Sequence, residues 1–167
     1  MIWSSSLTAV LGNQVHTSAW RTIAQERILC FAKATDDFQF VHTDPKRAAR
    51  ETPFGGTIAH GFLTLSMIST LTMDIMPVLE ETKAIVLVSA ERIKFMSAVK
   101  SGSRIRGLFR IDREKRLSYD KILIRLNCII EIENEPKPAM SCDLSWMLLR
   151  DQSSAGADLL AHERQSA

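Results

Sequence analysis

The sequence predicts an α+β fold in which an antiparallel sheet curves around one long helix. Residues 62–76 form a nonpolar stretch of helical length that ends before Pro77, and a helix that is apolar on most sides must be covered on most sides. From residue 104 onward, apolar and polar residues alternate, which is typical of half-buried strands. Early helices followed by a run of strands favour the α+β class.

The first half of the chain is predicted to be helical. Thr22 followed by Gln25 has the spacing of a capping box, in which each side chain satisfies a backbone N–H of the other residue. Asp44-Pro45 predicts an N-cap with proline at the first helical position, opening a short helix through Arg50. The pair Gly55-Gly56 then interrupts the backbone, and the long helix is expected to begin near His60 or Gly61.

The second half predicts antiparallel strands. In residues 121–133 every second residue from Ile122 to Ile132 is apolar and most of the others are polar, with Leu123 and Ile129 as exceptions. Further strands are expected at residues 85–95, 104–111 and 140–148. The edges of such a sheet need protection, most simply by pairing with a second copy of the chain.

Composition places the chain among ordinary globular proteins. Its 167 residues are 46% hydrophobic and 24% charged, which fits one domain, expected at residues 1–150, followed by a polar tail at residues 151–167. The net charge of +2 is too small to indicate a nucleic-acid surface. The longest nonpolar stretch is shorter than the roughly 20 residues of a membrane span, so membrane insertion is not expected.

Three cysteines, Cys30, Cys128 and Cys142, are an odd number without CxxC spacing. This pattern predicts reduced thiols on buried apolar faces rather than disulfides or a zinc site. Residues 1–9 also lack the basic flank and apolar run of a signal peptide. We therefore expect a cytoplasmic protein.

Asp37 and His42 are the first candidates for chemistry. A spacing of five places two side chains about 140° apart on a helix, so these two meet only if the segment between them is an irregular loop. A carboxylate and an imidazole that converge can hold a water molecule and move its proton. The alternative is that Asp36 and Asp37 are helix-end residues and that His42 lies on the surface.

Gly61 is the third candidate. The first N–H groups of a helix have no partner within it and lie at the positive end of its dipole. A glycine there lets a carbonyl oxygen approach closely, and one such donor is worth about 3–4 kcal/mol when negative charge develops on the oxygen. The alternative is that Gly61 only allows tight packing of the helix.

Residues 37–45 and 54–64 together resemble the signature of the MaoC-like (R)-specific enoyl-CoA hydratases, closest to the nodulation protein N-like branch. The resemblance extends from about Thr22 through Gly107. It implies a hot-dog fold and a homodimer whose two sheets join edge to edge. It also implies hydration, or the reverse dehydration, of a trans-2-enoyl thioester of coenzyme A or of an acyl-carrier protein. No metal or cofactor is implied, because coenzyme A is part of the substrate.

The resemblance assigns Asp37 and His42 as the catalytic pair and the Gly61 N–H as the donor to the thioester oxygen. Further candidates for substrate binding are Gln39, Phe40, Ser66, Arg92 and Lys94. For Ser66 the alternative is a hydrogen bond to its own helix backbone, and for the two cations it is a solvated face. His60 is expected to fix the loop or to pack.

Two other functions remain open. A hot-dog thioesterase needs a carboxylate on or beside the central helix, and Asp74 is too far along that helix to share a site with Gly61. A non-catalytic subunit that binds acyl thioesters does not require an intact pair of Asp37 and His42. An assay with crotonyl-CoA separates the three functions. Loss of the enoyl absorbance indicates the hydratase, release of free thiol indicates the thioesterase, and no turnover indicates the binding subunit.

Overall fold

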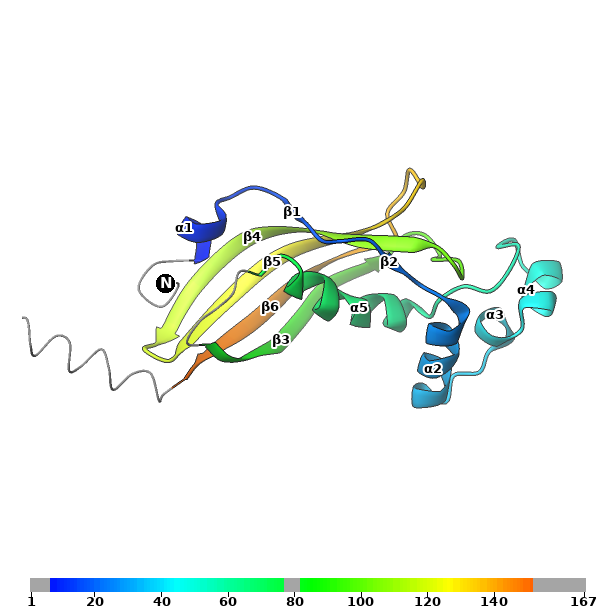
Figure 1. The fold of residues 1–167 in the computed structure, drawn as a ribbon, viewed down its shortest axis with the longest axis horizontal. Coiled ribbons are helices and arrows are strands. Elements are labelled where there is room, and N and C mark those ends of the chain that lie inside the picture. Colours follow the sequence, from blue (N-terminus) through cyan, green and yellow to red (C-terminus); the bar gives the residue numbers. More distant parts are fainter. Residues whose placement is uncertain (1–6, 77–81, 152–167) are drawn as a thin grey trace, which may run out of the picture.

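A computed structural model describes residues 7–76 and 82–151 of the chain. Within these ranges one antiparallel sheet of six strands has the order β1–β4–β5–β6–β3, and β2 also pairs with β4. The strands are β1 (His16–Thr17), β2 (Arg21–Thr22), β3 (Thr82–Phe95), β4 (Arg104–Ser118), β5 (Lys121–Ile132) and β6 (Met140–Arg150). The four long strands form an elongated sheet with α5 along one face (Figure 1).

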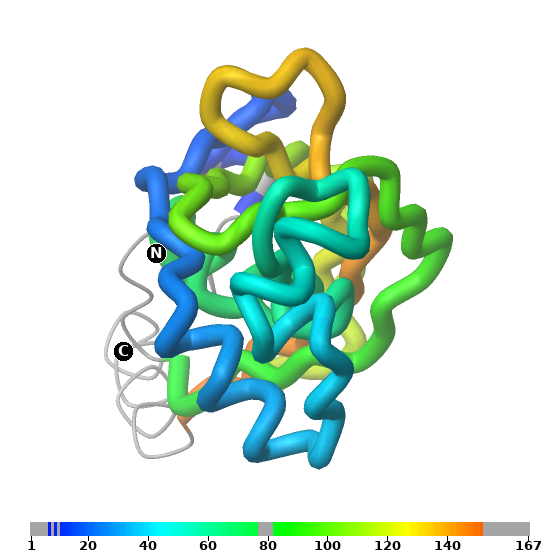
Figure 2. Tube along the Cα trace, turned by 90° about the vertical axis from the view of Figure 1, so that its right-hand side faces the viewer, coloured from blue at the N-terminus to red at the C-terminus, as the bar shows by residue number. Residues whose placement is uncertain are grey.

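The helices are α1 (Leu7–Leu11), α2 (Gln25–Thr35), α3 (Phe40–Thr43), α4 (Pro45–Glu51) and α5 (Gly61–Met73). Helices α2, α3 and α4 gather at one end of the sheet, next to the first turn of α5 (Figures 1 and 2). A sheet curved around a central helix is the hot-dog arrangement, so the predicted α+β class is confirmed. Apart from Asp151, the expected polar tail lies outside the described residues.

The alternation predicted for β5 produces the core. Its inward side chains pack with those of α5, and each fully buried Leu or Ile contributes about 1.5–3 kcal/mol. The buried residues of these two elements include Ile122, Ile124, Leu126, Ile130, Leu63, Met67, Ile68 and Leu71. The two exceptions in the pattern, Leu123 and Ile129, belong to the opposite face, where Leu123 is half-buried and Ile129 is exposed.

One side of α5 remains open in the single chain. The side chain of Phe62 is 68% exposed and Met73 is also exposed, and the intervening Ser66 and Thr70 lie on the same side of the helix. The sheet therefore covers α5 less completely than the sequence predicts. The open side adjoins β3, an edge strand with several exposed apolar side chains: Val86, Leu87, Val88 and Phe95.

The structure confirms one predicted cap and contradicts the other. The backbone N–H of Arg47 donates to Oδ1 of Asp44 over 3.0 Å, and Pro45 begins α4 as expected. The capping box of Thr22 and Gln25 is wrong, because Thr22 belongs to β2 and no side chain caps α2. The side chain of Gln25 is instead used in long-range hydrogen bonds, described below.

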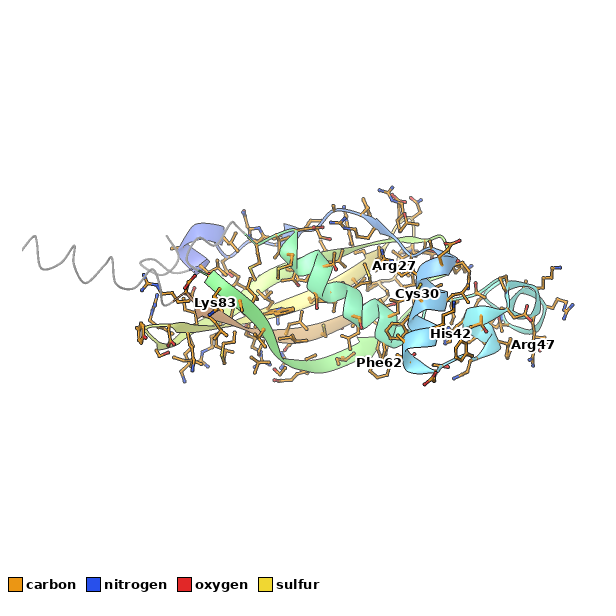
Figure 3. The ribbon with its side chains drawn as sticks, turned by 60° about the horizontal axis from the view of Figure 1, so that its bottom comes forward. Arg27, Cys30, His42, Arg47, Phe62 and Lys83 are labelled. Carbon is orange, nitrogen blue, oxygen red and sulfur yellow. The ribbon has the colours of Figure 1, made fainter. Side chains whose placement is uncertain are left out.

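The cysteines follow the prediction at two of three positions. Cys128 and Cys142 are buried and face each other across β5 and β6, and all three thiols are free. The prediction is wrong for Cys30, which is exposed on α2 (Figure 3). Cys30 lies two positions from Ile28 and from Ala32, the buried residues of α2, and two positions along a helix correspond to opposite sides.

No helix among the described residues is both long and apolar enough to span a membrane.

Candidate active site

Asp37 and His42 converge at the end of the sheet where the helices gather. Asp36 ends α2 in a left-handed conformation (φ 57°), and the chain turns through residues 37–39 before α3 begins at Phe40. A carboxylate oxygen of Asp37 and a ring nitrogen each of His42 and His60 then lie within 4.8 Å of one another. The expected loop is thus three residues long. The short helix α3 that follows it places the side chain of His42 close to that of Asp37. Figure 3 shows His42 beside the first turn of α5, where its ring stacks on that of His60.

A hydrogen bond fixes the tautomer of His42. Its Nδ1 lies 2.8 Å from the carbonyl oxygen of Ile58, which can only accept, so Nδ1 carries the proton and Nε2 keeps a free lone pair. Next to this bond, the backbone N–H of Ile58 donates to the carbonyl oxygen of Val41 over 3.0 Å. The ring is therefore tied to the strand-like segment that leads into α5.

Burial is the main cause that lowers the pKa of His42, while its hydrogen bond to Ile58 acts in the opposite direction. A positive charge on His60 would also lower this pKa, and the carboxylate of Asp37 would raise it. The net direction is downward, so His42 is neutral at pH 7. A neutral imidazole with a free Nε2 can accept a proton.

Asp37 keeps part of its carboxylate accessible. One oxygen, Oδ1, accepts a long hydrogen bond of 3.4 Å from the backbone N–H of Gln39, and the side chain is 41% exposed. The second oxygen, Oδ2, lies 4.0 Å from Nε2 of His60. The neighbouring Asp36 is exposed at the end of α2.

Gln25 is a residue of this region that the sequence assigned to another role. Its amide nitrogen donates to the carbonyl oxygen of His42 over 2.8 Å, and its amide oxygen accepts a short hydrogen bond from the hydroxyl of the buried Thr57. Gln25 thus joins the turn that carries His42 to the segment that leads into Gly61. Its partners lie 17 and 32 residues away, so no local sequence pattern could have identified them.

Gly61 begins α5, and the side chain of the N-cap residue His60 forms no capping hydrogen bond. A Cβ atom built on Gly61 would lie 3.2 Å from the ring of Phe95, which leaves little room for any larger residue. Gly61 also lines a cavity of about 340 Å³ together with Phe54, Ile58, Thr64 and Phe95. The lining of this cavity includes neither Asp37 nor His42. His60, which directly precedes Gly61, is one of the links between the pair and Gly61.

Three predicted substrate-binding residues belong to helices: Gln39 and Phe40 lie at the start of α3, and Ser66 lies in α5. Gln39 is exposed next to Asp37. The ring of Phe40 lies 4.0 Å beneath the guanidinium of Arg47 on α4. The hydroxyl of Ser66 donates to the carbonyl oxygen of Phe62 over 2.8 Å, which is the alternative weighed from the sequence. Ser66 also lines a second cavity, of about 250 Å³, between α5 and β3.

The two predicted cations lie on β3. Arg92, which has a positive φ of 51°, forms an ion pair with Asp143. Asp143 lies on the face of β6 opposite its core neighbours Cys142 and Leu144, so Arg92 is held on the face of the sheet opposite α5. Lys94 is exposed. The structure does not bring Arg92 together with Asp37 and His42, and substrate binding by either cation stays a prediction.

A metal ion is a poor match for the cluster of Asp37, His42 and His60. The two imidazole rings are stacked, with centroids 3.7 Å apart and an angle of 26° between their planes. An imidazole binds a metal through a lone pair in the plane of its ring, and two nearly parallel stacked rings cannot both direct such lone pairs at one ion. We therefore assign no metal to this cluster.

Comparison with known proteins identifies the family. The sequence model of the family described as "MaoC like domain" matches residues 6–125. Nodulation protein N from Rhizobium meliloti (strain 1021) is 39% identical over 157 residues, which cover 91% of this chain and 96% of that protein. The 3-hydroxyacyl-thioester dehydratase Z from Mycobacterium tuberculosis (strain H37Rv) is 36% identical, over 81% of this chain and 88% of the relative.

Solved structures share the fold. The unliganded R-hydratase PhaJ1 from Pseudomonas aeruginosa superimposes with a TM-score of 0.68, covering 83% of this chain and 82% of that one, at 20% sequence identity. At that identity the likeness concerns the fold alone. The family match and the two sequence relatives, which extend over most of the chain, show that this protein belongs to the MaoC-like dehydratase family.

Proposed function

We propose that this protein is an (R)-specific enoyl-thioester hydratase, acting in either direction, with Asp37 and His42 as its acid–base pair. The observation that carries the proposal is the convergence of these two side chains within 4.8 Å, with Nδ1 of His42 bonded to Ile58. A water molecule about 2.8 Å from each of two groups spans a separation of up to about 5.6 Å. The pair is thus close enough to hold one water between them.

In the proposed hydration, Nε2 of His42 accepts one hydrogen of this water and the carboxylate of Asp37 accepts the other. As one proton is removed, the water oxygen forms a bond to Cβ of the enoyl thioester. The C=C electron pair moves toward the thioester carbonyl and gives an enolate. The group that took the proton then returns it to Cα, so that one hydrogen of the water ends in the new hydroxyl and the other on Cα.

The backbone N–H of Gly61 is proposed to stabilise the negative charge on the thioester oxygen. Three features support this role: the position of Gly61 at the start of α5, the absence of a capping side chain there and the helix dipole. The ring of Phe95 lies close to Gly61, which is exposed in the single chain and so accessible to a substrate.

The proposed substrate is a thioester of coenzyme A or of an acyl-carrier protein, and the reaction uses no metal or organic cofactor. The name of the mycobacterial relative, a 3-hydroxyacyl-thioester dehydratase, supports this substrate class. The open side of α5 and the cavity between α5 and β3 offer apolar surface for an acyl chain.

The proposed assembly is a homodimer in which the β3 edges of two chains pair. Support comes from the outer edge of β3, which pairs with no other strand among residues 7–76 and 82–151, and from the exposed Val86, Leu87 and Val88. An exposed apolar edge strand is a site for pairing with another chain. A second copy placed there would also cover Phe62 on the open side of α5.

A thioesterase role has less support. Asp74, the acidic residue at the end of α5, lies about 20 Å from Gly61 at a rise of 1.5 Å per residue. Its carboxylate already accepts hydrogen bonds from the guanidinium of Arg21, at 2.6 Å, and from the backbone N–H of Ala19, at 3.2 Å. It is therefore engaged at the opposite end of the helix.

The test incubates the protein with crotonyl-CoA and follows both the enoyl absorbance and free thiol. Loss of absorbance without thiol release supports the hydratase, and chiral analysis of the product should give the (R)-3-hydroxy thioester. Release of thiol would replace this proposal with a thioesterase. Absence of turnover with enoyl thioesters of short, medium and long chains, on coenzyme A and on a carrier protein, would contradict any catalytic role.

A further inference from the structure

The side chain of His60 is almost completely buried, and it contacts both members of the proposed catalytic pair. It is 3% exposed. Its ring stacks on that of His42 with centroids 3.7 Å apart, and the ring of Phe31 from α2 lies 5.1 Å away on a tilted plane. Its Nε2 lies 3.0 Å from the backbone carbonyl oxygen of Asp37. One side chain thus links α2, the turn at Asp37 and the ring of His42.

The hydrogen bonding of His60 defines its tautomer. Because the carbonyl oxygen of Asp37 only accepts, Nε2 must be the protonated nitrogen. The other nitrogen, Nδ1, is buried and has no hydrogen-bond partner among residues 7–76 and 82–151. His60 therefore donates to Asp37 through Nε2.

We propose that His60 is a positioning residue for the hydratase reaction, and this inference rests on the proposed function. By donating to the carbonyl oxygen of Asp37, His60 fixes the backbone from which the carboxylate of the pair extends. By stacking on His42, it sets the plane of the imidazole whose Nε2 must face the water. Since His60 directly precedes Gly61, the same contacts set the distance between the acid–base pair and the proposed oxyanion donor.

A packing role predicts a different order of variants from a positioning role. His60→Phe keeps an aromatic ring against His42 and Phe31 but removes the donor to Asp37. His60→Gln loses the stacking, but its amide nitrogen has the reach to replace Nε2 as the donor. If His60 only fills space, His60→Phe should have the higher kcat of the two variants, because an apolar ring suits a buried site. If His60 positions Asp37, His60→Gln should have the higher kcat.

The experiment measures kcat and KM for crotonyl-CoA in the wild type and in both variants. We expect His60→Phe to lower kcat about 100-fold with little change in KM, as misplacement of catalytic groups by about 1 Å can do. His60→Gln should recover a large part of this loss. The matched control is His16→Phe, because Nε2 of His16 makes the same kind of bond, 3.0 Å from the carbonyl oxygen of Leu11, away from the cluster. The control should keep the wild-type kcat.

A second readout does not depend on turnover. Amide hydrogen exchange in residues 37–43 should be faster in His60→Phe than in the wild type, and slow again in His60→Gln, because the anchor of this turn is removed and then restored. Wild-type kcat in His60→Phe, or unchanged exchange in this segment, would overturn the inference. A wild-type protein that hydrates no enoyl thioester would instead contradict the proposed function, and the exchange experiment would still decide whether His60 anchors the turn.

Discussion

Nδ1 of His42 lies 2.8 Å from the carbonyl oxygen of Ile58, and this hydrogen bond determines what the imidazole can do. It commits the proton to the nitrogen that faces the protein and leaves Nε2 as an acceptor. Because Ile58 lies three residues before Gly61, the same bond connects the proposed base to the proposed oxyanion donor.

The pH dependence of hydration should reflect the lowered pKa of His42. Burial disfavours the charged imidazolium, so the ring stays neutral at pH values below its usual pKa of 6.5. As the pH falls, kcat/KM for crotonyl-CoA should therefore remain high through pH 6.5 and decline only at lower pH. An acid limb centred above 6.5 would contradict a neutral, buried His42 as the essential base.

Asp37→Asn and His42→Ala should each lower kcat about 100- to 10,000-fold, because each removes a group that transfers or orients the proton. The matched control is Asp36→Asn, which changes an exposed carboxylate one residue away and should leave kcat unchanged. Circular dichroism should show the same fold in all three variants. Equal losses in Asp36→Asn and Asp37→Asn would mean that the local charge, rather than Asp37 itself, is responsible.

Gly61→Ala should lower kcat/KM while the protein stays folded. The added methyl group would lie 3.2 Å from the ring of Phe95, at the point where the thioester oxygen is proposed to approach. Gly56→Ala is the control, since a Cβ there meets nothing within 4 Å and the residue has no positive φ. If both variants keep wild-type kcat/KM, the thioester oxygen does not approach Gly61 as closely as proposed.

Gln25→Leu should reduce the free energy of unfolding by about 1–3 kcal/mol, because it leaves the hydroxyl of buried Thr57 and the carbonyl of His42 without their partner. Urea denaturation followed by circular dichroism measures this change. The control, Gln14→Leu, alters an exposed glutamine in a loop and should be nearly neutral. A Gln25 variant as stable as the control would mean that this bridge contributes nothing to the native state.

Leu87→Lys should convert the proposed dimer to a monomer, because it places a charge on the edge strand β3. Sedimentation velocity gives the mass of the assembly. Leu117→Lys is a matched control, since Leu117 on β4 is 45% exposed and Leu87 is 44% exposed, and β4 lies toward the opposite side of the sheet from β3. A dimer that survives Leu87→Lys but is lost in Leu117→Lys would place the interface elsewhere.

Sequence patterns predicted those parts of the structure that depend on neighbouring residues. The cap formed by Asp44 and Pro45 is local, and the alternation in β5 follows directly from the two faces of a strand. The start of α5 at Gly61 also followed from the glycine pair before it and the apolar run after it.

The parts that failed depend on contacts distant in the sequence. The spacing of Thr22 and Gln25 satisfied a local rule, but Gln25 is recruited by His42 and Thr57. The stacking of His60 on His42 joins residues 18 positions apart and leaves no periodic trace. Cys30 was misjudged because a cysteine is small and apolar, and only the orientation of α2 decides which side of it meets solvent.

All the groups that are proposed to take part in the chemistry come from residues 37–61, a continuous segment of the chain. The long strands supply support for that segment and none of its reactive groups. A deep mutational scan should therefore separate into two populations along the sequence. Substitutions in the strands should change abundance and catalysis together, whereas those within the segment should abolish turnover in protein that still accumulates normally.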